Sequence, residues 1–515
     1  IFNNLNSYTQ EKGENRMLNS VIEYLKYSYK FYPDKNVIVD NYVGTSYREF
    51  FFRVCQIAGW INKNLNVVRK PIIVLMNNST EALETFFGIA LSNNIYVPLD
   101  SNIPLHRLES IVSIIKPAGI IICKENNQNL NIAGIPIIQF YELLSTKIET
   151  DIIKSCNAIV DTDPLYILFT SGSTGVPKGV VVSHKSVIDF TEEASETMDF
   201  SEKEIFLNQA PFYFDASVPD IFCTIRNGAT LHIIDKSLYA FPIKLVDYIE
   251  KNRINAIFWV PSALILVANL KALGKRNLSS LKKIMFCGEV MPTKQLNMWR
   301  QAVPNAIYVN YYGPSEATYA CSYYVVDREF KDEEVLPIGH AALNTDILLI
   351  NEKGEQVIAS NEKGEIYIRG TGLALGYYNN PEKTRECFIQ NPLQSSFPEI
   401  LYKTGDLAHY DSDRNIIYDG RVDYQIKHLG YRIELGEIES NVISMKDVKQ
   451  CACVYNEQKD IIVCFYSGDV EKKIIKELLK EKLPFYMIPK TVIQMKELPI
   501  NSNGKIDRIL LFQNT

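Results

Sequence analysis

Over roughly its first 340 residues, the chain alternates short apolar runs with amphipathic segments. Residues 71–76, 118–123, 229–234 and 256–260 are apolar and rich in β-branched side chains, so they predict buried strands. Residues 81–91, between the first two runs, carry apolar side chains at helical spacing and predict a helix. Such strand–helix–strand alternation predicts parallel-type sheets whose faces are covered by helices.

From about residue 340 the pattern changes. Residues 346–350 and 364–369 predict short strands separated by turns, which is typical of an antiparallel, barrel-like region. After this region the sequence predicts, in order, a helix, two strands and a second helix: residues 434–445, 449–455, 461–466 and 471–482.

These patterns predict two domains. Residues 1–422 are expected to form a large α/β N-terminal domain, with two parallel-type sheets covered by helices plus a β-barrel-like subdomain. Residues 423–515 are expected to form a small, mobile α+β C-terminal domain. The boundary is predicted near the polar, turn-forming stretch 419–424.

The composition narrows the class of protein. The 515 residues are 46% hydrophobic and 22% charged, which are ordinary globular values. The net charge of −6 lacks the basic footprint of a nucleic-acid binder. No apolar run approaches the ~20 residues that span a bilayer, and the first residues are polar rather than typical of a signal peptide. We therefore expect a cytoplasmic monomer that neither binds nucleic acid nor inserts into membranes.

Ten cysteines are scattered along the chain, and none forms a CxxC pair. Cys451 and Cys453 are separated by a single residue, which is too tight for the usual zinc-knuckle spacing. Because most of them stand in apolar context, as Cys123 and Cys464 do, we expect buried free thiols in a reducing compartment.

The strongest local motif lies in residues 168–180, where an apolar run leads into glycines, hydroxyl side chains and a lysine. Glycines let backbone N–H groups approach an anion closely, and hydroxyls add further donors. The composition predicts a phosphate-binding loop, although on composition alone a flexible connecting loop is an alternative. It is not a Walker loop, because Pro177 stands five residues after Gly172.

The sequence of this loop resembles that of the adenylate-forming superfamily. That superfamily includes peptide-synthetase adenylation domains, D-alanine–carrier protein ligases, acyl-CoA synthetases and luciferases. Further motifs that resemble this superfamily stand in family order along the chain, one before this loop and the others after it: residues 45–50, 310–318, 364–370, 402–407, 420–434, 483–489 and 503–507. The resemblance implies a two-step reaction with ATP and Mg²⁺. A carboxylic acid first becomes an acyl-adenylate with release of pyrophosphate, and a carrier phosphopantetheine thiol then takes the acyl group.

The resemblance also implies which residues bind ATP. Tyr312 would stack on adenine with Tyr418 beside it, Asp406 would bind the ribose hydroxyls, and Arg421 would reach the ribose and phosphate. Glu316 would be the magnesium ligand. The full implied ATP-binding set is Thr170, Ser171, Gly172, Ser173, Thr174, Gly175, Lys178, Tyr312, Gly313, Ser315, Asp406, Tyr418 and Arg421.

By the same resemblance, Lys505 is the catalytic lysine that bridges the substrate carboxylate and the α-phosphate. A carboxylate must attack an anionic phosphate, so a cation is needed where the negative charge concentrates. Outside this motif a solvated surface lysine would be the ordinary interpretation. Asp423 corresponds to the hinge about which the small domain swings, and the pantetheine arm would enter near Gly430.

Asp215 interrupts an apolar run and, by resemblance to amino-acid-activating members, pairs with the substrate ammonium. A helix N-cap aspartate is the alternative. The implied substrate-binding set is Asp215, Ala216, Pro219, Trp259, Met285, Cys287, Tyr311, Tyr319 and Ala320. Because several of these side chains are bulky, we expect a small substrate such as alanine, glycine or serine.

Residues 285–292 resemble D-alanine–carrier protein ligases, in which the cysteine at the position of Cys287 favours the D form. A buried structural cysteine is the alternative. Tyr311 and Tyr319 are larger than expected for that subfamily, and residues 434–439 are closer to the peptide-synthetase version.

The function predicted from the sequence is therefore ATP-dependent activation of a small amino acid, with D-alanine favoured, and transfer to a carrier protein. No condensation motif is found, and no carrier motif follows Lys505, so the acceptor thiol is expected in trans, from a stand-alone ligase or an excised domain. An acyl- or aryl-CoA ligase is an alternative that Asp215 disfavours. A catalytically silent nucleotide-binding module is another, disfavoured by the presence of Lys505, Glu316 and Asp406.

Overall fold

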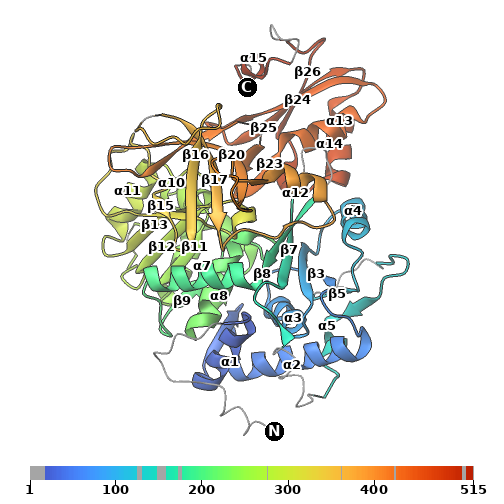
Figure 1. Cartoon of the computed structure of the whole chain (residues 1–515), viewed down its shortest axis with the longest axis vertical. Helices are drawn as coiled ribbons and strands as arrows, with labels where there is room; N and C mark the ends of the chain where they lie inside the picture. The colour runs from blue at the N-terminus through green and yellow to red at the C-terminus, as the bar shows by residue number, and fades with distance from the viewer. Residues whose placement is uncertain are drawn as a thin grey trace.

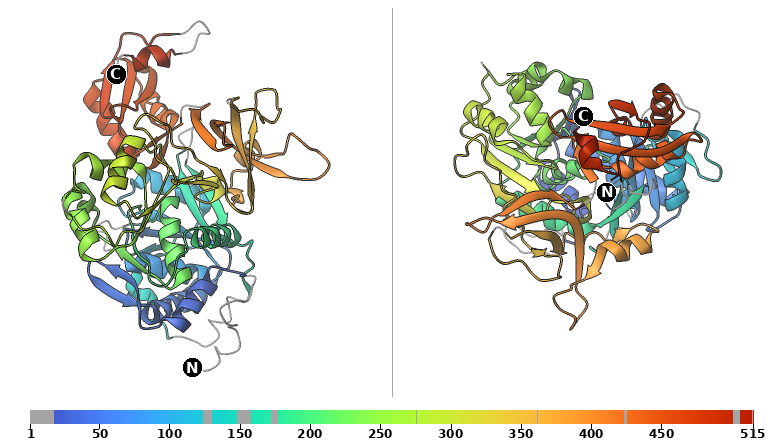
Figure 2. Two further views of the ribbon diagram at one scale, coloured as in Figure 1. Left: turned by 90° about the vertical axis from the view of Figure 1, so that its left-hand side faces the viewer. Right: turned by 90° about the horizontal axis from the view of Figure 1, so that it is seen from above.

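The computed structural model describes residues 18–123, 130–147, 158–171, 177–274, 276–360, 362–422, 425–500, 506–513 and 515. Six predicted site residues lie outside these ranges: Gly172, Ser173, Thr174, Gly175, Asp423 and Lys505. A large N-terminal body carries a smaller C-terminal domain at one end (Figure 1). A further sheet projects from the side of the body (Figure 2).

Two largely parallel sheets form the body. The first has the strand order β15-β14-β13-β12-β11-β9-β10-β1-β2, and the second has the order β18-β8-β7-β4-β3-β5-β6. The first comprises β1 (Asn36–Asp40), β2 (Val43–Ser46), β9 (Ile205–Leu207), β10 (Thr230–Ile233), β11 (Ala256–Trp259), β12 (Lys283–Cys287), β13 (Ile307–Tyr312), β14 (Ser322–Val325) and β15 (His340–Ala341). The second comprises β3 (Pro71–Met76), β4 (Ile95–Asp100), β5 (Ile120–Ile122), β6 (Ile137–Gln139), β7 (Pro164–Thr170), β8 (Lys178–Ser183) and β18 (Gly376–Tyr377). Antiparallel pairs stand at both ends of the first sheet and at the β18 end of the second, and the predicted parallel-type sheets are confirmed.

Helices fill the space between the two sheets and cover their outer faces. The inner helices contribute to one core cluster: α1 (Ile22–Phe31), α2 (Tyr47–Asn64), α3 (Thr80–Leu91), α5 (Phe140–Leu143), α7 (His184–Thr197) and α8 (Val218–Asn227). A second cluster lies between the other face of the first sheet and α9 (Pro242–Lys251), α10 (Pro261–Asn269) and α11 (Thr293–Ala302). Helix α4 (Leu105–Ile115) covers the second sheet. The two faces of the first sheet therefore pack against different helices, and a side chain on one of its strands belongs to one cluster or to the other.

The third sheet is antiparallel, with the order β16-β17-β20-β19 and with β21 paired to β20. Its elements are β16 (Thr345–Ile350), β17 (Gly364–Gly370), β19 (Phe388–Gln390), β20 (Ile400–Tyr410) and β21 (Ile416–Arg421), with α12 (Pro381–Cys387) beside it. This is the half-barrel sheet seen projecting in Figure 2, and it confirms the predicted barrel-like region.

The C-terminal domain begins with a hairpin, β22 (Gln425–His428) and β23 (Tyr431–Glu434). A small sheet follows, built from β24 (Val448–Asn456), β25 (Ile461–Gly468) and β26 (Thr491–Gln494). Helices α13 (Leu435–Ile443) and α14 (Lys472–Lys482) pack on one face, and α15 (Arg508–Phe512) packs on the other. The predicted helix–strand–strand–helix order is confirmed, while the boundary between 422 and 423 stays a prediction.

Within the described ranges, no helix combines the length and the apolar character needed to cross a bilayer.

Candidate active site

Asp215 stands in a short 3₁₀ turn, Asp215–Ser217, that leads into α8. The Ser315 hydroxyl donates to its Oδ2 at 2.5 Å. Burial raises the pKa of Asp215, while the Ser315 hydrogen bond and the charge of Lys427 act to lower it. The N-cap alternative is wrong, because the N-cap residues of the turn and of α8 are Phe214 and Ser217. The carboxylate is thus a half-buried anion facing the 315–316 turn.

Most of the predicted substrate-binding side chains are gathered next to α8. Met285 and Cys287 on β12 and Tyr311 on β13 belong to the core cluster that also contains Tyr319 and Ala320. Ala216 packs against the same cluster, and Pro219 is buried near the start of α8. The Tyr311 and Tyr319 ring centroids lie 6.4 Å apart. The structure therefore places eight of the nine predicted residues in this core cluster or next to it: Asp215, Ala216, Pro219, Met285, Cys287, Tyr311, Tyr319 and Ala320.

Trp259 is the exception. Its side chain belongs to the cluster on the other face of the first sheet, and its Nε1 donates to the Leu207 carbonyl at 3.0 Å. Side chains alternate along a strand, so the preceding residue, Phe258, faces the cluster that holds Met285. The Phe258 ring lies 6.2 Å from that of Tyr311. The structure therefore separates Trp259 from the other predicted substrate-binding residues, and Phe258 is the side chain of β11 that stands on their face of the sheet.

Cys287 is 3% exposed, and its Sγ lies 3.9 Å from the Tyr319 carbonyl oxygen. Burial raises the pKa of the Cys287 thiol to about 12. The thiol therefore stays protonated and is unsuited to act as a nucleophile. The contact of Cys287 with substrate, which the resemblance implies, stays a prediction.

The predicted adenosine-binding residues form a second group, where β13 meets the half-barrel sheet. Asp406 is 2% exposed and accepts hydrogen bonds from the Tyr312 hydroxyl at 2.5 Å and from Arg421 at 2.6 Å. The Tyr418 ring centroid lies 6.3 Å from that of Tyr312. A Cβ at Gly313 would stand 2.5 Å from the Ala320 Cα, so only glycine fits there.

The described ends of the phosphate loop contact the C-terminal domain. Thr170, the last residue of β7, pairs with Lys178 of β8. The Ser171 hydroxyl donates to the Arg432 carbonyl and accepts from the Glu434 N–H, both at 2.9 Å. Lys178 Nζ lies 3.2 Å from Glu434 Oε1. Strand β23 therefore occupies the position at which the sequence predicts phosphates.

Glu316 is 1% exposed and contacts both domains. It accepts a hydrogen bond from the Tyr377 hydroxyl at 2.6 Å and pairs with Arg432 at 2.5 Å. Burial acts to raise the pKa of Glu316, but the Arg432 charge and the Tyr377 hydrogen bond hold it below its usual value. A buried carboxylate of this kind fits Mg²⁺, which prefers oxygen ligands, once Arg432 has moved away. The role of metal ligand stays a prediction.

The hairpin turn of the C-terminal domain is anchored to the body. The Gly430 N–H donates to Glu289 Oε1 at 2.6 Å, and Glu289 Oε2 accepts from the Ser262 N–H at 2.8 Å. Gly430 has a φ of +79°, and a Cβ added there would lie 2.9 Å from Val260 Cγ1. Lys427 Nζ lies 5.6 Å from the centre of the Tyr312 ring. The hairpin thus reaches the predicted adenine, phosphate and metal positions together.

Sequence reasoning assigned no role to Lys427, Arg432 or Glu289. The first two stand inside the 420–434 motif, so the resemblance located the segment without showing what its side chains contact. The available signal was the set of charged residues, Lys427, Arg432 and Glu434, in a short segment directly after the predicted domain boundary.

Two further contacts fix the C-terminal domain against the body. Phe214, next to Asp215, meets the Tyr431 ring edge-on at 4.6 Å, and Tyr431 stacks on Tyr486 at 3.8 Å. Arg107 pairs with Glu437 at 2.5 Å, with side chains 8% and 1% exposed. These contacts bury both charge and aromatic surface at the interface.

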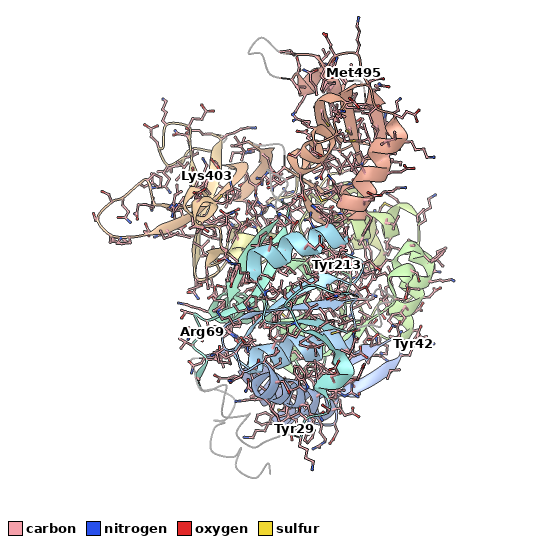
Figure 3. The ribbon with its side chains drawn as sticks, turned by 90° about the vertical axis from the view of Figure 1, so that its right-hand side faces the viewer. Tyr29, Tyr42, Arg69, Tyr213, Lys403 and Met495 are labelled. Atoms are coloured by element: carbon pink, nitrogen blue, oxygen red, sulfur yellow. The ribbon has the colours of Figure 1, made fainter. Side chains whose placement is uncertain are left out.

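The segments flanking Lys505 lie on the other side of this domain. Ile500 and Ile506 bridge each other, and Ile506 and Met495 pack against the cluster under α15. Figure 3 shows Met495 at the end of the molecule far from Tyr213, which directly precedes the interface residue Phe214. The hairpin side of the small domain, rather than this side, faces the site.

The fold and the site together define an adenylate-forming enzyme with two domains. Residues 25–378 match the AMP-binding enzyme family, and residues 437–505 match the AMP-binding enzyme C-terminal domain. The chain belongs to the AMP-binding enzyme family.

Curated relatives cover almost the whole chain. A protein from Listeria monocytogenes serotype 4b (strain F2365), named D-alanine–D-alanyl carrier protein ligase, is 34% identical over 484 residues, which is 91% of this chain and 94% of that protein. Zwittermicin A synthase ZmaJ from Bacillus cereus is 31% identical over 93% of this chain and 92% of its own length.

Solved structures share the fold. PA1221, a nonribosomal peptide synthetase protein with adenylation and carrier domains, has a TM-score of 0.84 at 23% identity, covering 96% of this chain and 84% of that one. The Vibrio cholerae adenylation domain AlmE, solved with glycyl-adenosine-5′-phosphate, has a TM-score of 0.82 at 21% identity, covering 98% and 99%.

Proposed function

We propose that this chain is an AMP-forming ligase that activates D-alanine as an aminoacyl-adenylate and transfers it to the phosphopantetheine thiol of a carrier protein. The observation that carries the proposal is the half-buried Asp215 carboxylate, which accepts from Ser315 and lies close enough to Cys287 and Tyr319 to act on them electrostatically. The relatives named D-alanine–D-alanyl carrier protein ligase support the choice of amino acid. A monomer in the cytoplasm, with the carrier supplied in trans, belongs to the same proposal.

The proposed site has two parts, one that binds the amino acid and one that binds ATP. Asp215 pairs with the substrate ammonium, whose transfer from water would otherwise be costly. The bulky side chains Met285, Tyr311 and Tyr319 favour a substrate with a small side chain. Tyr312 and Asp406 hold the adenosine, and Ser171 and Lys178 hold phosphate oxygens. A magnesium ion bound at Glu316 would supply positive charge to the phosphates. Lys505 brings a cation to the reacting carboxylate and α-phosphate.

We assign the described arrangement to the thiol-transfer step. Glu434 lies against Ser171 and Lys178, so its carboxylate would repel a triphosphate bound there. This contact suits the stage after pyrophosphate has left. Gly430, near the expected entry of the pantetheine arm, is at that stage held by Glu289.

ATP–pyrophosphate exchange tests the proposal. The panel contains D-alanine, L-alanine, glycine, serine and β-alanine, with benzoate and a fatty acid as controls. We expect exchange with D-alanine to exceed that with every other acid. Exchange with benzoate or the fatty acid, and none with the amino acids, would show instead an acyl- or aryl-CoA ligase. Exchange with L-alanine above D-alanine would contradict the assigned chirality only.

A further inference from the structure

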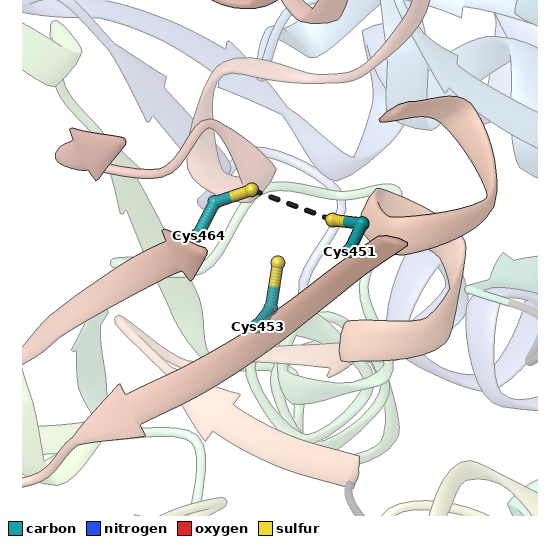
Figure 4. Close-up of side chains that lie close together, drawn as sticks. All are labelled: Cys451, Cys453 and Cys464. Atoms are coloured by element: carbon teal, nitrogen blue, oxygen red, sulfur yellow. Dashed lines mark hydrogen bonds between the residues drawn. The ribbon is translucent and has the colours of Figure 1, made fainter. Parts of the chain in front are cut away.

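Three thiols meet in the core of the C-terminal domain, away from the site described above. Cys451 and Cys453 stand two residues apart on β24, and Cys464 is the direct cross-strand partner of Cys453 on β25. All three side chains point to the face covered by α13 and α14. Figure 4 shows the sulfur atoms converging.

The three sulfur atoms are close enough together to bind one ion. Cys451 Sγ and Cys464 Sγ are 3.6 Å apart, and all three sulfurs lie within 4.8 Å of one another. Among the histidines, cysteines and acidic residues that the structure describes, this is the one group of three or more close enough to share an ion. Sequence spacing could not show it, because the third sulfur comes from the neighbouring strand.

We propose that Cys451, Cys453 and Cys464 form a binding site for a soft trivalent metalloid of the arsenic(III) class. Thiolates are soft ligands and select soft ions. Three thiolates around a trivalent centre give a neutral complex, which an apolar core can hold without the cost of a buried charge. Ile438, Ile475 and Leu479 belong to this core.

A divalent ion fits the same position less well. Zinc with three thiolates keeps a net negative charge and prefers a fourth ligand. The neighbouring carboxylate, Glu439, is already engaged: its Oε1 accepts from the Cys453 N–H and from Arg508, and its Oε2 accepts from Arg508. A monovalent ion would leave more negative charge still.

The binding step balances without an oxidant. Arsenous acid, As(OH)₃, exchanges its three hydroxyls for three thiols: three S–H and three As–O bonds break, three As–S bonds form, and three water molecules leave. The cysteines are 3%, 0% and 0% exposed, so entry requires local opening of the small domain. Binding is therefore slow, and the bound centre joins β24 to β25.

The test uses the full chain with arsenite as the probe, under reducing conditions. We expect native mass spectrometry to show one arsenic per chain with the loss of three hydrogens, and arsenic-edge X-ray absorption to show three sulfur neighbours and no oxygen. Cys451→Val, Cys453→Val and Cys464→Val should each lose the three-sulfur signature. Cys55→Val, at another buried cysteine in α2, should keep it.

Arsenic–oxygen neighbours in the unmodified chain, or equal three-sulfur binding by the variants, would overturn the proposal. So would one Zn²⁺ per chain held by the same thiols in the presence of equimolar arsenite.

Discussion

The turn of the β22–β23 hairpin provides a quantitative test of domain docking, through the substitution Gly430→Ala. The substitution has two separate free-energy costs, one from backbone strain and one from a steric contact. At a φ of +79°, an alanine is strained by about 1–2 kcal/mol whether or not the hairpin is docked. The second cost exists only in the docked arrangement, where the new Cβ would lie 2.9 Å from Val260 Cγ1.

The docking-specific cost sets the size of the effect. Relief of the contact requires the Val260 side chain to leave its preferred rotamer, which costs about 0.5–1.5 kcal/mol. Since 1.4 kcal/mol is tenfold in an equilibrium constant, the docked population should fall roughly 2- to 10-fold. If docking serves thiol transfer, loading of the carrier should fall by the same factor, while adenylate formation is unchanged.

The assay measures both steps on the same preparations. ATP–pyrophosphate exchange reports the first step, and single-turnover transfer of labelled D-alanine to a holo carrier protein reports the second. Val260→Ala removes the atom that collides, so in the Gly430→Ala background it should restore loading, whereas alone it should change loading little. The coupling in this double-mutant cycle isolates the contact.

Two results would refute the reasoning. If Gly430→Ala lowers exchange as much as loading, the docked hairpin is not specific to the second step. If Val260→Ala fails to rescue loading, the loss comes from strain within the turn rather than from the approach of the two domains.

Four further expectations follow from the structure. Asp215→Asn should abolish exchange with D-alanine while ATP binding persists, and the exposed control Asp469→Asn should leave exchange intact; normal exchange by Asp215→Asn would end the ammonium-pairing proposal. Arg107→Met leaves Glu437 buried without its cation, so loading should fall more than exchange, and equal effects would contradict a docking role. Cys287→Ala should lower the D-to-L ratio measured by exchange; an unchanged ratio would favour a purely structural cysteine. Burial lowers the pKa of His184 from 6.5 to about 4, so between these two pH values a proton binds the unfolded state but not the folded one. The free energy of unfolding should therefore fall by about 3 kcal/mol from pH 6.5 to pH 4. Urea unfolding of His184→Gln should lack this dependence.

Local periodicity predicted most of the fold because strands and helices of this chain have strong local signatures. The apolar run 71–76 is β3 without a shift in either end, and the predicted helix 81–91 is α3 with one added residue. The change of pattern after residue 340 located the half-barrel sheet, because short strands between turns cannot form the parallel units that precede them.

The sequence could not show which face of the first sheet Trp259 occupies. Strand β11 is only four residues long and is buried on both faces, so its sequence lacks the alternation of polar and apolar residues that shows which way a side chain points. Only the two clusters on its opposite faces, one with Met285 and one with Leu207, separate Phe258 from Trp259.

The contacts between domains were beyond sequence reasoning for another reason. Arg432 and Glu316 are 116 positions apart in the sequence, and nothing local to either residue encodes their pairing. The same holds for Cys464, which reaches Cys453 only through the register of β24 and β25. Family motifs located such segments, and the tertiary structure was needed to show what they touch.

The charges at the interface explain why nucleotide binding and docking should compete. Arg432 and Glu434 stand on one strand, the first neutralising Glu316 and the second neutralising Lys178. When the hairpin leaves, both pairings end together, and a buried anion and a cation become available at neighbouring positions. Under the proposed function, Glu316 would hold the magnesium ion and Lys178 a phosphate oxygen, so a magnesium–triphosphate complex would supply the opposite charge to each residue. Release of pyrophosphate would recreate the two unpaired charges, and a returning hairpin neutralises them. The exchange of one set of ion pairs for the other can therefore couple the chemical step to the movement of the domain.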